Sequence, residues 1–307
     1  IAVGPFWQKI VRPMRTLQLG CDANPHGIEF DITWESAAPP YDEAPGVMHY
    51  AEGRLSSSRS NYVQLGWISG RVKVGGREWR FGREDGWVGA RDHSWGMGHT
   101  GEGEKPNRHA APPRVTGEKS LWGSRGMRHW GLVRFPGRSL FYAFKRNADG
   151  SYSASGTGFQ DASSIHSRVE YPYDSGMEGW AYRDVSISDH EWQDGLPRFR
   201  SGKVSLARPD GGTDRFRIDV VSKPVYMQGA GYWGGWNDRL GRGVYRGEEM
   251  MEGEVWDVSH PVKVLGPDGQ LVPPPPGAEY AEQFARYTNL DDPSEVGLGI
   301  LEAAIIG

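Results

Sequence analysis

The segment WVGARDHSWGMGH, residues 87–99, gathers ionisable and aromatic side chains in a short stretch that contains three glycines. An imidazole beside a carboxylate and under aromatic cover can have its pKa moved to suit proton transfer near neutral pH. Arg91, Asp92 and His93 are therefore the candidate catalytic residues. The alternative is a structural role, in which Asp92 and Arg91 form a buried pair and His93 satisfies backbone groups.

The spacing of these residues restricts how they act together. If a strand runs from Trp87 to Trp95, alternate residues share a face, so His93 lies on the opposite face from Asp92 and Ser94. The candidate acid and base then reach one pocket only if a bulge or turn at Gly89 interrupts the strand, or if the site is divided between a barrel interior and its rim.

A second aromatic segment, residues 229–249, combines seven glycines with tryptophan, tyrosine, Asn237 and charged residues. Glycines allow backbone and rings to approach closely, so this segment forms either an aromatic wall of an apolar ligand site or an aromatic turn between two sheets. Together the two segments supply the candidate substrate-binding residues, namely Trp95, His99, Tyr232, Trp233, Trp236 and Asp238.

The elements that must position these residues are predicted to be strands. The chain has 307 residues with 44 Gly, 21 Pro, 13 Trp and 13 Tyr, a composition typical of many short strands joined by tight turns. Residues 28–34 alternate apolar and polar side chains, as a half-buried strand does. Hairpin turns are predicted at Gly75-Gly76, Asp149-Gly150 and Asp210-Gly211. The fold class expected is all-β, with two antiparallel barrels or sandwiches.

The expected organisation is an N-terminal β domain at 1–165, a C-terminal β domain at 166–272, and a proline linker with a helical tail at 273–307. Residues 98–120 are rich in Gly, Pro and charge and are predicted to be a long loop. Tyr280, Phe284 and Tyr287 have helical spacing, which predicts one short C-terminal helix. The last residues, VGLGILEAAIIG, are apolar enough to require cover by the body of the protein or by a second subunit in a homodimer.

Charge and composition exclude several classes of function. The net charge of −4 gives no electrostatic support for nucleic-acid binding. The sequence contains no run of about 18 apolar residues, so no membrane-spanning helix is predicted. Cys21 is the single cysteine, which excludes an internal disulfide and a cysteine-based metal cage and suits a cytoplasmic location. The histidine spacings match no metal motif, so no metal is expected.

Two hydrolytic reactions are minor alternatives. Ser94 lies beside His93, although no G-x-S-x-G motif accompanies it. Asp92 and Asp238 are a candidate carboxylate pair for glycoside hydrolysis, and the thirteen tryptophans would suit stacking on sugar rings. The sequence does not fix the distance between the two carboxylates.

The residues from Trp87 to Gly96 resemble the hallmark of the double-lipocalin-like superfamily that includes carotenoid 1,2-hydratases and kievitone hydratase. They are most similar to its uncharacterised bacterial relatives, which carry a G-x-R-D-H-S-W-G segment. The resemblance implies two lipocalin-like β-barrel domains side by side, an apolar pocket near their junction and no organic cofactor. It implies hydratase-type chemistry at Asp92 and His93, while the charged 98–120 loop departs from the carotenoid enzymes, so their substrate does not transfer.

Two functions from different classes follow. The first is a cofactor-independent lyase or isomerase that moves a proton on a hydrophobic small molecule, such as a terpenoid, steroid or aromatic natural product. His93 would be the general acid or base, Asp92 its partner or the acid itself, and Arg91 an electrostatic support. The second is a lipocalin-like binding protein that carries an apolar ligand unchanged.

Overall fold

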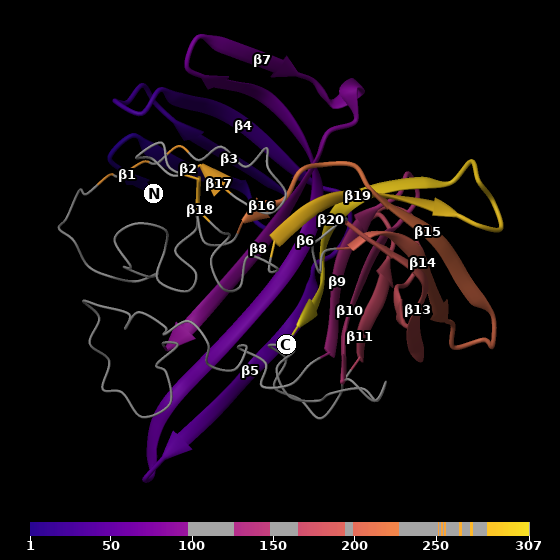
Figure 1. Cartoon of the computed structure of the whole chain (residues 1–307). Helices are drawn as coiled ribbons and strands as arrows, with labels where there is room; N and C mark the ends of the chain where they lie inside the picture. The colour runs from indigo at the N-terminus through magenta and orange to yellow at the C-terminus, as the bar shows by residue number, and fades with distance from the viewer. Residues whose placement is uncertain are drawn as a thin grey trace.

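A computed structural model shows an all-β protein built from two large antiparallel sheets (Figure 1). No helix in the described part of the chain is long and apolar enough to cross a membrane. A single 3-10 turn, Arg83–Asp85, interrupts the strands there. The structure describes residues 1–97, 126–147, 165–193, 199–226 and 281–306, together with 251, 253, 255, 264–265 and 271–272.

The first sheet contains the strands that come first in the sequence. Its main path runs in the order β1-β2-β3-β4-β6-β5, with β7 and β8 also paired to β6. The strands are β1 (Ala2–Val3), β2 (Phe6–Arg12), β3 (Thr16–Cys21), β4 (Ile28–Ser36), β5 (Tyr41–Ala51), β6 (Arg54–Val74), β7 (Arg77–Phe81) and β8 (Val88–Met97).

The long strand β6 organises this sheet. One of its edges pairs with β5 and then β4, and the other pairs with β8 and then β7. Strand β4 covers the predicted strand at 28–34, and Val74 pairs with Arg77 across the predicted Gly75-Gly76 turn. Both predictions from local sequence are confirmed.

The second sheet has the order β12-β11-β10-β9-β20-β19-β15-β14-β13, with β16 paired to β19. Its strands are β9 (Gly126–Arg134), β10 (Ser139–Asn147), β11 (Ile165–Glu170), β12 (Trp180–Ala181), β13 (Asp184–Trp192), β14 (Phe199–Ala207), β15 (Thr213–Val220), β16 (Val225–Tyr226), β19 (Ala281–Asn289) and β20 (Val296–Ile306). A separate pair is formed by β17 (Val264–Leu265) and β18 (Leu271–Val272).

The predicted C-terminal helix is wrong, because the segment that was expected to contain it forms β19. Burial there alternates with period two: Gln283, Ala285 and Tyr287 are buried, whereas Phe284 is 44% exposed. Pairing with β15 on one side and β20 on the other satisfies the backbone of β19 and overrides the local helical spacing. The apolar end of the chain forms β20, in which Leu301 and Ala303 are buried, whereas Val296 and Leu298 are 38% and 40% exposed.

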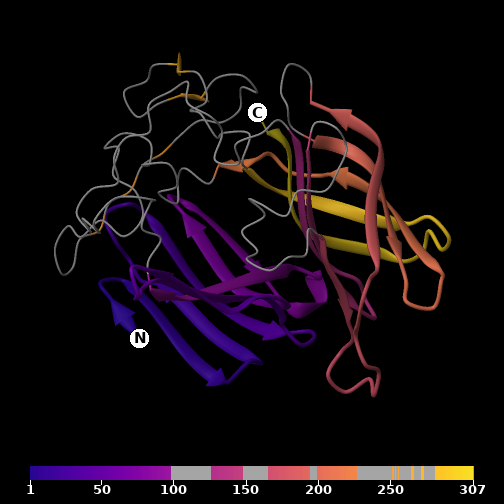
Figure 2. The same cartoon turned by 90° about the horizontal axis from the view of Figure 1, so that it is seen from below.

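The two sheets divide the chain elsewhere than the expected domain boundary. Residue 165 begins β11, which pairs with β10 in the same sheet, so a division at 165 would separate two paired strands. Residues 281–306 of the expected tail lie inside the second sheet. Among the strands described, those up to Met97 belong to the first sheet and those from Gly126 onward to the second, apart from the β17-β18 pair. Viewed from below, the two curled sheets lie side by side (Figure 2).

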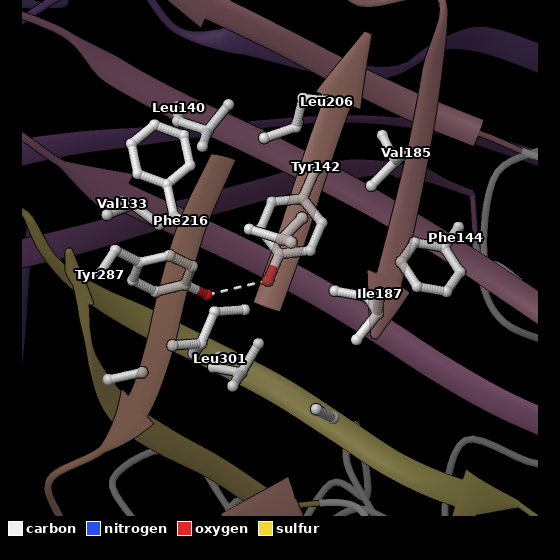
Figure 3. Packing of buried hydrophobic residues seen from close by; sticks show 14 of the residues in the cluster. Val133, Leu140, Tyr142, Phe144, Val185, Ile187, Leu206, Phe216, Tyr287 and Leu301 are labelled. Atoms are coloured by element: carbon white, nitrogen blue, oxygen red, sulfur yellow. Dashed lines mark hydrogen bonds between the residues drawn. The ribbon is translucent and has the colours of Figure 1, made fainter. Parts of the chain in front are cut away.

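The main apolar core lies inside the curl of the second sheet (Figure 3). Tyr142 and Tyr287 meet at its centre with their hydroxyl oxygens 3.0 Å apart. Gly131 lies in register with Tyr142, and a Cβ atom at Gly131 would fall 2.5 Å from the Tyr142 ring. The glycine therefore gives the tyrosine room to lie across β9 and reach its partner.

One end of this core is closed by a polar network. Arg138 binds both carboxylate oxygens of Glu295, at 3.0 and 2.9 Å, and also contacts Asp214 at 3.0 Å. Tyr182 donates a hydrogen bond of 2.6 Å to the same oxygen of Asp214. The network ties β15 to the turns that follow β9 and β19.

Candidate functional site

The two sheets meet along β6 and β8 on one side and β9, β10 and β20 on the other. Tyr41 stacks on Phe141 with ring centroids 4.1 Å apart, and its hydroxyl lies 3.2 Å from Nδ1 of His166. The apolar part of this junction consists of Val63, Leu65, Trp130, Leu132, Phe141 and Ala143, with Tyr41, Ala90 and Ile300 packed against them.

Glu43 places a carboxylate inside this apolar junction. The register between β5 and β6 shifts between Asp42 and Ala44, so Glu43 occupies a bulge. A bulge re-aims one side chain without ending the strand. The Glu43 side chain points inward, and the residue is only 7% exposed.

Two donors from different sheets bind the Glu43 carboxylate. Trp130 Nε1 donates a hydrogen bond of 2.7 Å to Oε1, and Asn61 Nδ2 donates one to Oε2. The pKa of Glu43 is raised to about 7, chiefly by burial and to a lesser extent by the charge of Asp92, against the lowering effect of the Trp130 hydrogen bond. A carboxyl group with this pKa can give or accept a proton near neutral pH.

Asp92 faces the same junction from β8. It pairs with Val63 on β6, and Ser94 Oγ lies 3.4 Å from Asp92 Oδ1 on the same face. Asp92 is more exposed than Glu43, and its negative charge acts on both Glu43 and Glu282. The candidate acid from the sequence therefore belongs to this site.

The second sheet contributes two more carboxylates. Glu282, Glu302 and Trp130 occupy one cross-strand row over β19, β20 and β9. Arg128 forms an ion pair of 3.0 Å with Glu302, and burial raises the pKa of Glu282 to about 7, helped by Glu302 and Asp92. We refer to these charged residues as the junction cluster: Glu43, Asp92, Arg128, Glu282 and Glu302.

His93 lies on the other face of β8, as strand alternation predicted. Its Nδ1 atom is 3.1 Å from the Tyr62 hydroxyl and 3.1 Å from Nη2 of Arg91. The Arg91 guanidinium lies 5.0 Å from the centre of the Tyr62 ring, and Trp95, which is 51% exposed, packs edge-on against His93. The structure therefore does not bring the candidate pair Asp92 and His93 into one site, and Arg91 accompanies His93.

The remaining predicted binding residues fall outside the described residues, so the structure does not place them. They are His99, Tyr232, Trp233, Trp236 and Asp238. The predicted turn at Asp149-Gly150 and the 98–120 loop also lie outside the described residues. Where the structure can be described, no group of three or more His, Cys, Asp or Glu side chains is arranged to hold a metal ion.

Sequence reasoning missed most of the junction cluster. Glu302 gave a usable signal, because it is the one charged residue in the apolar run VGLGILEAAII. An isolated charge at an inward position of a buried strand requires a partner or a function. Glu43 gave no such signal, because its inward direction depends on a bulge and its donors come from distant strands.

A family model described as a family of unknown function, DUF8625, matches residues 1–307. The chain belongs to this family. No curated protein matches the chain.

Two solved structures are similar in arrangement. Kievitone hydratase from Nectria haematococca is 9% identical with a TM-score of 0.44, and the match covers 99% of this chain and 70% of that chain. A Nitrosomonas europaea protein named as an AttH has the same identity and TM-score, 9% and 0.44, over 95% of this chain and 66% of its own. At these values the likeness assigns neither activity nor substrate to this chain.

Proposed function

We propose that the junction cluster is an acid/base site, and that the protein is a cofactor-independent lyase or isomerase for a hydrophobic small molecule. The observation that carries this proposal is the Glu43 carboxyl group, which is buried between two sheets and has a pKa of about 7. Perturbed carboxyl groups of this kind are common at catalytic sites. The apolar side chains around Glu43 suit a terpenoid, steroid or aromatic substrate.

The chemistry is that of proton transfer to carbon. Protonated Glu43 gives its proton to one carbon of a double bond, which leaves a carbocation on the other carbon and a carboxylate on Glu43. Water adds to the cation, and the proton it releases returns to the Glu43 carboxylate, so that hydration is balanced. Dehydration is the reverse, and loss of a proton from a neighbouring carbon instead of water addition gives isomerisation.

The rest of the junction cluster favours this reaction electrostatically. A carbocation develops positive charge in the transition state, and fixed negative charges nearby stabilise it. Asp92 and Glu302 supply such charges around Glu43. Asn61 and Trp130 hold the Glu43 carboxyl in one orientation, which reduces the reorganisation needed at the moment of transfer.

The proposal is tested by hydrogen exchange in deuterated water with three probes, geraniol, progesterone and vinylphenol. Mass spectrometry measures deuterium at carbon in each probe. We expect incorporation with the wild-type protein, loss of that incorporation in Glu43→Gln, and retention in Asp42→Asn, which removes an exposed carboxylate next to the site. Equal incorporation by wild-type protein and Glu43→Gln would refute the role of Glu43.

A second candidate function is a lipocalin-like carrier of an apolar ligand. It is favoured by the arrangement of Arg91, His93, Tyr62 and Trp95, which contact one another on the face away from Glu43. That part of the RDHSWG motif is then structural. The carrier would be favoured if the wild-type protein binds a probe but incorporates no deuterium into any of the three, so that the bound probe is recovered chemically unchanged.

A further inference from the structure

An open groove crosses one face of the first sheet over β4, β6 and β7, in the upper part of Figure 1. Its volume is about 540 Å³, within the range of roughly 300–1,000 Å³ that is typical of small-molecule sites. Asp31 pairs with Arg71 and Arg71 pairs with Arg80, so these three side chains share the face that lines the groove. Ser69 lies on the same face. The groove therefore has a charged and polar lining.

Two glycines keep the groove free of further side chains. Gly70 has φ of +139°, and a Cβ atom there would clash with the carbonyl oxygen of Asp31 on the paired strand. A Cβ atom at Gly82 would clash with the carboxylate of Glu84, which lies against this glycine. The Gly82 N–H donates a hydrogen bond of 2.8 Å to Asp85, which fixes the turn beside the groove.

Several polar groups in the groove are available to a ligand. Within the described part of the chain, the exposed carboxylates of Asp31 and Glu84 form neither a hydrogen bond nor an ion pair. Arg80 forms an ion pair with Glu78, whereas Arg71 lies 3.9 Å from the other oxygen of that carboxylate. Arg71 therefore keeps most of its five N–H donors for a ligand.

The mixture of charges disfavours an ionic ligand. No group of acidic, histidine or cysteine side chains among the described residues is arranged for a metal ion, and Arg71 and Arg80 oppose any cation. An anion would meet the carboxylates of Asp31, Glu84 and Asp85. A neutral ligand with several hydroxyl groups suits both signs, because each hydroxyl donates one hydrogen bond and accepts others.

An aromatic ring extends this polar row across the sheet. Gly20 on β3 pairs with Asp31 on one side and with Trp7 of β2 on the other. The indole lies against Gly20, where a Cβ atom would clash with the ring, and its Nε1 donates a hydrogen bond of 3.2 Å to Asp22. The partly exposed Trp7 ring therefore lies beside Asp31. A sugar ring has an apolar face of C–H groups that packs well on such a ring.

We propose that this groove binds a neutral oligosaccharide. The Asp31 and Glu84 carboxylates accept hydrogen bonds from sugar hydroxyls, Arg71 donates to them, and a neighbouring sugar ring packs on Trp7. Adjacent strands are about 4.8 Å apart, so the row from Trp7 to Arg80 spans roughly 19 Å, which favours several sugar units over a single one. The site is independent of the proposed acid/base site, because it uses no residue of the junction cluster.

The test is saturation-transfer NMR of the full chain with four neutral probes, maltotriose, cellotriose, xylotriose and chitotriose, and with the anionic trigalacturonic acid. We expect at least one neutral probe to bind at millimolar concentration or below. Asp31→Asn, Arg71→Ala and Glu84→Gln should each weaken its binding about tenfold or more, because each removes a charged hydrogen-bonding group. Glu52→Gln, at the exposed turn between β5 and β6, should leave the binding unchanged.

Three results would overturn the proposal. The first is that none of the four neutral probes binds. The second is that trigalacturonic acid binds as tightly as the best neutral probe, which would show that the groove does not select a neutral ligand. The third is that the groove variants that circular dichroism shows to be folded bind the best neutral probe with the affinity of the wild-type protein.

Discussion

The Glu43→Gln variant is expected to be less stable than the wild-type protein at low pH and more stable than it at high pH. In the folded protein the pKa of Glu43 is raised from 4.5 to about 7. The folded state therefore keeps a proton that the unfolded state releases. The stability that this provides is complete below the unfolded pKa and is lost as pH rises through the folded pKa.

The magnitude follows from the two pKa values. At about 1.4 kcal/mol for each pKa unit, ionisation of Glu43 costs the folded protein about 3 kcal/mol. Glutamine never ionises, but its amide accepts from one donor only, so either Asn61 or Trp130 loses its acceptor at a cost of about 1 kcal/mol. Glu43→Gln should be about 1 kcal/mol less stable than wild type near pH 3.5, about equal to it near pH 5, and about 2 kcal/mol more stable near pH 8.5.

Urea unfolding followed by tryptophan fluorescence at several pH values measures this difference. Other groups with raised or lowered pKa, including Glu282 and His129, titrate in both proteins and cancel in the comparison. Asp42→Asn serves as the control, because Asp42 is the exposed neighbour of Glu43. A difference between wild type and Glu43→Gln that stays constant over the whole pH range would refute the assignment of a buried, protonated Glu43.

Three further substitutions test other parts of the structure. Asp92→Asn should lower the pKa of Glu43, because it removes a nearby negative charge, and carbon NMR of the Glu43 carboxyl would show the titration at lower pH. Arg138→Ala should reduce the free energy of unfolding by about 3 kcal/mol in urea, because Glu295 loses its cation and, among the described residues, Asp214 keeps only Arg208, at 3.6 Å. Tyr142→Phe should cost about 1–3 kcal/mol by leaving the Tyr287 hydroxyl unpaired. Adding Tyr287→Phe should then cost less than it does alone, and additive costs in calorimetry would contradict the pairing.

Local sequence was sufficient for the features that depend on near neighbours. The alternation over 28–34 predicted β4, the Gly75-Gly76 pair predicted a hairpin, and alternation along residues 87–95 predicted that Asp92 and His93 separate. The first and third rest on the period of two along a strand, and the second rests on the positive φ that glycine allows in a tight turn. The motif at residues 87–96 also directed attention to Asp92, which is one part of the candidate site.

Features that depend on distant pairing were not predictable in this way. The 281–289 segment carries aromatic residues at helical spacing, and only its pairing with β15 and β20 makes it a strand. The surroundings of Glu43 come from β5, β6, β8 and β9, and Pro45 and Gly46 beside its bulge indicate an irregular strand but not which side chain turns inward. The candidate site therefore lies where the sequence pattern is least informative.

The position of β20 has a consequence for how the protein is made. Strand β20 lies between β9 and β19, so β9 emerges from the ribosome long before its neighbour on one side exists. Until β20 is synthesised, the apolar interior of the second sheet and one edge of β9 stay open, and open edges pair readily with other chains. The strands described for the first sheet all precede residue 98, so that sheet can form early. Synthesis of this protein thus leaves a folded half attached to an incomplete one, and chaperone binding to the nascent chain is expected to end when residues 296–306 are released.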